Sequence, residues 1–197
     1  MIAVPEGLPG DESVAYLRRA GIAERNSLSP EERAKKSAAA CVRIAESEAF
    51  AAAETVMIYD SVRGELSLEA LLSHPAAAGK RFVYPLCVSR TEMKAYRPGA
   101  WQRGAFGIRE PVPELSEEIP PGEIGLVICP CTVFDEDGNR IGMGAGYYDR
   151  FLPRCSRAVV IAAAFEAQKT EHVPARPWDH PVDAVFTEES IYIAKKG

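Results

Sequence analysis

Residues 138–149, with the sequence G-N-R-I-G-M-G-A-G-Y-Y-D, combine residue types that suit phosphate chemistry. Three glycines at alternate positions leave the backbone free of side chains, so its N–H groups can close on an anion. Arg140 supplies a cation with a planar fork of donors, and Asp149 supplies oxygen ligands of the kind that hard metal ions prefer. Tyr147 and Tyr148 can wall a flat ligand. The segment therefore predicts nucleotide-dependent chemistry on a ring-containing substrate.

The glycine spacing separates this segment from the two commonest phosphate loops. G-x-G-x-G is not the G-x-G-x-x-G dinucleotide motif, and no G-K-[ST] follows it as in a P-loop. Taken alone, the glycines equally allow a flexible surface turn. The complete string resembles the R-x-G-x-G-x-G-Y-Y-D segment of the 5-formyltetrahydrofolate cyclo-ligases, which are also called methenyltetrahydrofolate synthetases.

Length and composition limit the class of protein. The 197 residues, of which 47% are hydrophobic and 26% charged, are typical of one soluble globular domain. A formal net charge of −5 argues against non-specific nucleic-acid binding. No apolar run reaches the length of a membrane span and the first residues lack a signal-peptide pattern, so we expect a cytoplasmic protein. The five scattered cysteines predict reduced, mostly buried thiols.

The N-terminal region predicts a tail followed by two helices. Residues 1–11 are rich in proline and glycine and are expected to form a loose tail, with residues 12–197 as a single α/β domain. Asp11 is a candidate cap for the first helix, whose polar face is expected to expose Arg25. Residues 29–32, S-P-E-E, combine a capping serine, a proline at the first helical position and a glutamate at the third, which predicts a capping box.

Strands and helices alternate along the rest of the chain. This alternation predicts a three-layer α/β/α domain with a parallel or mixed central sheet. Ligands in such sheets bind beyond the carboxyl ends of the strands, and the glycine segment follows a nearly pure apolar strand. Pro85 is expected to end its strand, and residues 109–122 are expected to form an exposed connection. The predicted strands are 55–59, 81–84, 93–96, 126–129, 159–165, 184–186 and 191–193, and helices are expected around 68–72 and from 147 to before Pro153.

The resemblance to the cyclo-ligase family extends from the first helix nearly to the C-terminus. Further stretches match the family's pattern in the same order, which a chance match would not preserve. They are R-N-S-L-S-P-E-E at 25–32, D-S-V-R-G-E at 60–65, F-G-I-R-E-P at 106–111, C-P-C-T-V-F-D at 129–135 and W-D at 178–179.

The resemblance implies a reaction as well as a fold. The family converts 5-formyltetrahydrofolate to 5,10-methenyltetrahydrofolate with ATP and Mg²⁺, and releases ADP and phosphate through a phosphorylated N5-formyl (iminium phosphate) intermediate. It implies catalytic roles for Arg140, Tyr147 and Asp149, with Asp149 and Asp179 as Mg²⁺ ligands. The implied nucleotide contacts are Arg18, Arg140, Ile141, Gly142, Met143, Gly144, Ala145, Gly146, Tyr147 and Tyr148, and the implied folate contacts are Asp60, Glu65, Phe106, Met143, Gly144, Ala145, Gly146 and Tyr147.

Without the resemblance, several of these residues have ordinary structural explanations. Arg18 would be a surface arginine of a helix, and Asp149 would cap a helix. Glu65 would be a solvated turn residue, and Phe106 a plain core residue.

One position departs from the family's pattern. The family usually has a lysine four residues before the first-helix arginine, where this chain has Val14. Because a phosphate-binding cation is missing there, a second hypothesis stays open, a non-catalytic regulator that binds reduced folate. A third, from fold analogy alone, is a sugar-phosphate isomerase or transferase. We expect a monomer that acts on 5-formyltetrahydrofolate, with no nucleic-acid or membrane partner.

Overall fold

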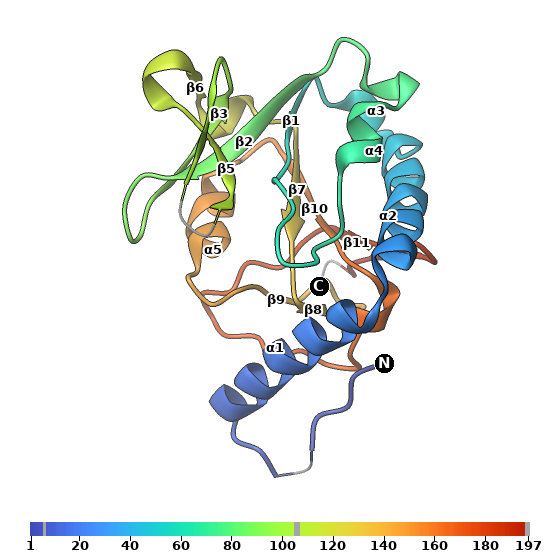
Figure 1. Cartoon of the computed structure of the whole chain (residues 1–197). Coiled ribbons are helices and arrows are strands. Elements are labelled where there is room, and N and C mark those ends of the chain that lie inside the picture. Colours follow the sequence, from blue (N-terminus) through green and yellow to red (C-terminus); the bar gives the residue numbers. More distant parts are fainter. Residues whose placement is uncertain (6, 105–106, 196–197) are drawn as a thin grey trace.

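A mixed β-sheet forms the centre of the protein (Figure 1). The computed structural model describes residues 1–5, 7–104 and 107–195. Within them the main sheet has eight strands in the order β12-β11-β10-β7-β1-β2-β3-β6. These strands are β1 (Thr55–Met57), β2 (Arg81–Cys87), β3 (Met93–Arg97), β6 (Glu117–Ile119), β7 (Leu126–Pro130), β10 (Val159–Ala163), β11 (Ala184–Phe186) and β12 (Ile191–Ile193).

The sheet is parallel inside and antiparallel at both edges. Strands β2, β1, β7, β10 and β11 run parallel, whereas β12 pairs antiparallel with β11, and β3 with both β2 and β6. The predicted mixed sheet is therefore confirmed. Two small antiparallel ribbons lie outside it, formed by β4 (Trp101–Arg103) with β5 (Arg109–Pro111) and by β8 (Val133–Phe134) with β9 (Arg140–Ile141).

Helices cover both faces of the sheet, which confirms the predicted α/β/α layers. Helices α2 (Pro30–Ala45), α3 (Glu48–Ala52) and α4 (Glu69–Leu72) pack on one face, and α5 (Tyr147–Phe151) packs on the other (Figure 1). Among the described residues no helix is long and apolar enough to cross a membrane. The remaining helical elements are α1 (Gly10–Ser27) and the 3-10 turns η1 (Pro75–Ala77), η3 (Pro113–Leu115), η4 (Pro121–Glu123), η5 (Leu152–Arg154) and η6 (Glu166–Gln168).

Alternation along β7 divides the core between the two faces. Leu126 and Ile128 join Ile44 of α2 in one hydrophobic cluster. Val127 and Cys129 join the cluster around α5 and η5 on the opposite face. This period of two is what a strand buried on both sides requires, so the apolar run is explained by its central place in the sheet.

The predicted capping box at the start of α2 is confirmed. The Ser29 hydroxyl accepts a hydrogen bond from the Glu32 N–H at 3.1 Å, and Glu32 Oε2 accepts one from the Ser29 N–H at 2.8 Å. The pair satisfies two N–H groups that have no partner within the helix.

The N-terminal expectations are wrong in two details. Helix α1 begins at Gly10, and its cap residue, Pro9, makes no side-chain hydrogen bond, so Asp11 lies inside the helix and is not its cap. The segment before it is anchored, because Ile2 is buried and its N–H donates to the Lys169 carbonyl at 2.7 Å. The buried side chain of Ile2 thus fixes the start of a segment whose proline and glycine content predicted a loose tail.

Pro85 does not end its strand. Strand β2 continues to Cys87, and Pro85 pairs with Ala95 of β3. On the other side of β2 the pairing with β1 stops at Val83, opposite Met57. Proline lacks an N–H donor, and it is accepted here because the strand has a single neighbour at this position.

Residues 109–122 are more ordered than expected. They contain β5 and β6, and Ile119 of β6 is buried where it pairs with Ala95. The prediction of an exposed connection is wrong at this point, because β6 forms the edge of the main sheet.

The thiol prediction is confirmed for the described residues. All five cysteines are free, and four of them are buried. Cys87 is the exposed exception.

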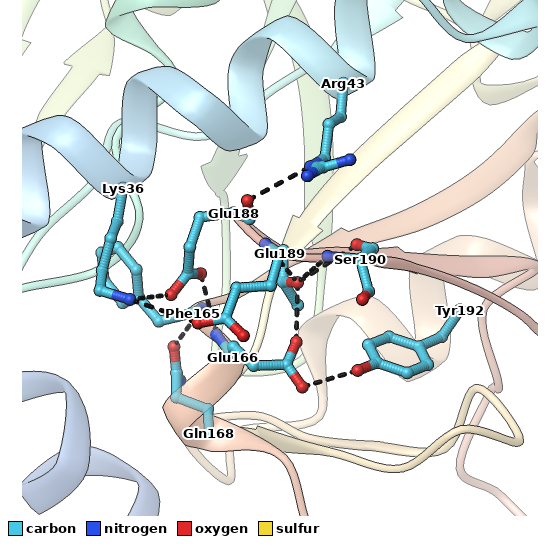
Figure 2. A network of polar contacts seen from close by, with 10 residues as sticks. Lys36, Arg43, Phe165, Glu166, Gln168, Glu188, Glu189, Ser190 and Tyr192 are labelled. Atoms are coloured by element: carbon cyan, nitrogen blue, oxygen red, sulfur yellow. Dashed lines mark hydrogen bonds and ion pairs between the residues drawn. The ribbon is translucent and has the colours of Figure 1, made fainter.

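A polar network joins α2 to the β11–β12 hairpin (Figure 2). We call it the Glu188 network and define it by Lys36, Glu166, Thr187, Glu188 and Tyr192. Lys36 pairs with Glu188 Oε1, and Glu188 Oε2 accepts from the Glu166 N–H at 2.9 Å. Glu166 accepts from the Thr187 hydroxyl at 2.8 Å and from the Tyr192 hydroxyl at 2.6 Å. Every carboxylate oxygen in the network therefore has a donor.

Candidate active site

A cavity lies at the point in the sheet where consecutive connections lead to opposite sides. Strands β1 and β7 are parallel neighbours, but β1 continues to β2 on one side and β7 continues to β10 on the other. A cavity of about 800 Å³ is lined by Tyr59 and Asp60, which follow β1, and by residues 130–132, which end β7 or follow it. Reversal points of this kind are where open α/β sheets bind ligands, and the volume suits a ligand of cofactor size.

The β8–β9 ribbon brings the glycine segment to this cavity. The chain turns back after β7, and both the N–H and the hydroxyl of Thr132 donate to the Ile141 carbonyl, at 2.7 and 2.8 Å. Gly144 and Gly146 adopt φ angles of 98° and 66°, which disfavour side chains, and Gly146 is the N-cap residue of α5. The glycines thus allow a backbone turn along the cavity wall.

Arg140 is a buried cation with an unused donor. Only 7% of the residue is exposed, and its Nη2 donates to Asp149 Oδ1 at 2.9 Å. Its Nε is buried without a hydrogen-bond partner in the part of the chain that the structure describes. An unpaired buried donor is costly, so its place in the cavity wall is explained most simply by an anionic ligand.

Arg18 places a second guanidinium beside the glycine segment. Its Nε donates to the Gly142 carbonyl at 2.8 Å, and a Cβ added at Gly144 would lie 3.5 Å from its Cζ. Burial, followed by the nearby positive charge of Arg176, lowers the pKa of Arg18. The Arg18 side chain therefore lines the cavity and is not an ordinary solvated residue of the helix surface.

Glu65 brings a carboxylate to the same cavity. Its Oε2 accepts from the Val62 N–H at 3.1 Å, and its Oε1 lies 3.8 Å from Arg25 Nη1. Burial raises the pKa of Glu65. The expected exposure of Arg25 is wrong, since the residue is only 1% exposed, because α1 packs its last turn against the loop that holds Glu65.

Asp60 reaches the cavity with its carboxylate already engaged. Arg109 donates to it from Nη2 at 2.9 Å and from its backbone N–H at 3.2 Å. Phe106, the other folate contact implied near this wall, lies outside the described residues.

The two implied metal ligands both line the cavity. Asp149 Oδ1 accepts from Arg140 and, at 3.3 Å, from the His180 N–H, which places residue 179 close by. Asp179 Oδ2 accepts from the Arg176 N–H at 2.9 Å. The described residues contain no group of three or more His, Cys, Asp or Glu side chains that could hold a metal ion by themselves.

A strap joins the glycine segment to the turn between β2 and β3. The Tyr147 hydroxyl donates to the Ser89 carbonyl at 3.0 Å. Arg150 donates from Nε to the Thr91 carbonyl at 2.7 Å and from Nη2 to the Ala145 carbonyl at 2.8 Å. Arg150 thus shapes the wall through backbone carbonyls.

Every implied site residue that the structure describes lines this one cavity, and their roles stay predictions. The sequence reasoning missed Arg176, which also lines it. The available signal was a basic residue three positions before Asp179.

Comparisons with known proteins place the chain in a family. A sequence model of the 5-formyltetrahydrofolate cyclo-ligase family matches residues 11–188. The chain is 29% identical over 175 residues to 5-formyltetrahydrofolate cyclo-ligase of Escherichia coli K12, covering 85% of this chain and 96% of that protein. It is 32% identical over 150 residues to the same-named protein of Mycolicibacterium smegmatis, covering 71% and 76%.

A solved structure extends the likeness to the fold. The NMR structure of Aquifex aeolicus 5,10-methenyltetrahydrofolate synthetase matches with a TM-score of 0.81 at 31% identity, covering 93% of this chain and 94% of that one. Sequence and fold agree over nearly the whole length. The chain therefore belongs to the 5-formyltetrahydrofolate cyclo-ligase family and is an enzyme, a ligase.

Proposed function

We propose that the protein converts 5-formyltetrahydrofolate to 5,10-methenyltetrahydrofolate, using ATP and Mg²⁺ and releasing ADP and phosphate through a phosphorylated N5-formyl intermediate. The observation that carries the proposal is the buried Nε of Arg140, which has no hydrogen-bond partner among the described residues and lies in the wall of a cavity of about 800 Å³. Family membership supplies the reaction, and this donor supplies a reason for an anion to bind here.

The phosphate end of the cavity is built from guanidinium and backbone donors. Arg140 belongs to the glycine segment and Arg18 donates to it, and both line the cavity where side chains are small enough for N–H groups to approach an anion. Such fixed donors stabilise charge that develops on a phosphoryl group during its transfer. The formyl oxygen that receives the phosphoryl group would lie beside Tyr147, whose half-buried ring lines the same wall.

Asp149 and Asp179 fit a magnesium site that substrate phosphates complete. Two carboxylates are too few for a site made of protein alone, but Mg²⁺ commonly takes one or two carboxylates with phosphate oxygens and water. When bound, Mg²⁺ would neutralise negative charge on the transferred phosphoryl group. Arg140 holds Asp149 through Oδ1, and no hydrogen bond from the described residues reaches Oδ2, which is open to a metal ion.

Glu65 suits recognition of the pterin ring of the folate. A pterin edge presents amino and N–H donors, and Glu65 presents a carboxylate whose Oε1 lies 3.8 Å from Arg25 Nη1. Most of the remaining exposed lining of the cavity is apolar, as a ring system requires.

Formation of 5,10-methenyltetrahydrofolate tests the proposal. Protein, 5-formyltetrahydrofolate, ATP and Mg²⁺ are mixed at neutral pH, and absorbance is followed at the methenyl band. We expect a rise that disappears without ATP or with excess EDTA. Asp149→Asn should slow it by about 100-fold. Asp137→Asn removes an equal charge from an exposed position in the turn between β8 and β9 and should change nothing.

A second candidate, a regulator that binds reduced folate without turnover, is favoured by one observation. Val14 lines the cavity and is buried, so α1 offers an apolar side chain one turn before Arg18. A flat absorbance trace together with measurable binding of 5-formyltetrahydrofolate would establish this candidate in place of the enzyme.

A further inference from the structure

Arg176 adds a cation to the cavity for which the roles above give no use. It lies in the segment 174–179, between η6 and β11, and lines the cavity together with Arg18. Its side chain is 37% exposed, so burial does not force it against its neighbours. After burial, the positive charge of Arg176 lowers the pKa of Arg18, while the carboxylate of Asp179 acts in the opposite direction.

The backbone around Arg176 is fixed in a short turn. The Arg176 N–H donates to Asp179 Oδ2 at 2.9 Å, and the Asp179 N–H donates to the Arg176 carbonyl at 3.0 Å. The guanidinium carbon also lies 5.8 Å from the centre of the Trp178 ring. The side chain is therefore directed from a rigid base and can reach a ligand at a modest entropic cost.

The present partner of Arg176 is a weak one. Its Nη2 pairs with Asp11 Oδ1 on the first turn of α1, and the Asp11 side chain is 88% exposed. An ion pair so open to solvent contributes only about 0–1 kcal/mol to stability. This pair does not explain why two like charges are held on one wall, because a neutral residue would avoid the repulsion.

A ligand with several negative charges does explain it. Guanidinium forks match phosphate oxygens in pairs, and such charge-assisted bonds are stronger than bonds between neutral groups. An exposed carboxylate such as Asp11 would give way to phosphate, since its pairing is screened by water and salt.

We infer that Arg176 is a second phosphate-binding residue on this wall, which acts with Arg18 on the phosphate chain of ATP and exchanges Asp11 for phosphate oxygens when the nucleotide enters. The inference rests on the proposed use of ATP. It makes Arg176 a determinant of nucleotide specificity, because its contribution grows with the number of phosphates.

Nucleotide binding to the whole protein tests this role. Dissociation constants for ATP, ADP and AMP are measured by calorimetry with Mg²⁺, for wild type, Arg176→Ala and Arg19→Ala. Arg19 is exposed on α1 outside the cavity, so its variant removes the same charge without the contact. We expect Arg176→Ala to weaken ATP by about tenfold, with AMP within about twofold of wild type, and Arg19→Ala to resemble wild type.

Two further arms separate binding from folding. Arg176→Ala should raise the KM for ATP while leaving the KM for 5-formyltetrahydrofolate unchanged, with thermal unfolding close to that of wild type. Asp11→Ala removes the competing carboxylate and should bind ATP at least as tightly as wild type does.

The outcomes distinguish this inference from the proposed function. Unchanged ATP affinity in Arg176→Ala, beside normal turnover, would overturn the role of Arg176 and leave the enzyme assignment standing. Equal loss of affinity for ATP and AMP in Arg176→Ala would show that Arg176 supports the structure of the cavity and does not contact the phosphate chain. Wild-type protein that binds no ATP would refute the proposed function itself, and the inference with it.

Discussion

The cavity and the Glu188 network are both polar, yet they differ in how completely their groups are paired. In the network each carboxylate oxygen of Glu166 and Glu188 has a donor within the protein (Figure 2). In the cavity Arg140 keeps an unpartnered Nε, and Arg18 faces the like charge of Arg176. Complete pairing stabilises the fold. An unpaired buried donor destabilises it, and a ligand that accepts a hydrogen bond from that donor removes the cost.

The largest expected effect is in the cavity, from Arg140→Ala. Loss of this donor should lower kcat/KM by about 10²–10³-fold, because its fixed charge would no longer meet the phosphoryl group. Thermal unfolding should change less than activity does, since Asp149, the ion-pair partner of Arg140, is 22% exposed and stays in contact with water. Steady-state kinetics and calorimetry check both halves. A variant that unfolds easily and retains activity when folded would reverse the comparison.

Glu188→Ala should have the opposite effects, a loss of stability with unchanged activity. Glu188 is 5% exposed in its side chain, and its loss leaves Lys36 and the Glu166 N–H without their acceptor. We expect the free energy of unfolding to fall by about 2 kcal/mol, with unchanged kcat at temperatures where the variant is folded. Urea denaturation measures the first quantity.

Glu189→Ala is the matched control, because Glu189 pairs with the same Lys36 at 3.7 Å but is 60% exposed. It should lose less than about 1 kcal/mol. Equal losses in the two variants would contradict the assignment of stability to the buried pairing.

Glu65 gives the cavity a dependence on pH. Burial raises the pKa of this carboxyl above its ordinary value of 4.5. Protonation removes an acceptor, so folate binding should weaken as pH falls through the raised pKa, and the acidic limb of kcat/KM should lie above pH 4.5. Glu65→Gln should abolish this limb and raise the KM for the folate by about tenfold. An unchanged limb would assign it to another group.

A small effect is expected from Tyr192→Phe in the Glu188 network. The variant loses the hydroxyl that donates to Glu166 Oε1 at 2.6 Å and accepts from Lys169 Nζ at 3.2 Å. We expect a loss of about 1 kcal/mol in unfolding free energy and no change in activity. Any sizeable change in the KM for ATP would show that the two regions are coupled.

The sequence by itself determined the features that depend on near neighbours along the chain. The capping box of Ser29 and Glu32 needs only residues within one turn. The apolar run of β7 is likewise visible in consecutive residues, and such a run predicts a strand that is buried on both faces. The glycine segment was predictable for the same reason, since its backbone conformations are set locally. These patterns, with the resemblance, predicted the fold class and the residues that line the cavity.

The tertiary structure alone decided which distant segments meet. It buried Arg25 of α1 beside Glu65, although the helical pattern predicted an exposed arginine. Pro85 fits within β2 because the pairing with β1 stops at Val83. Arg176 and Arg18, which are far apart in the sequence, line the same cavity. Pairing, burial and repulsion between such segments arise from their separation in space, which no local pattern encodes.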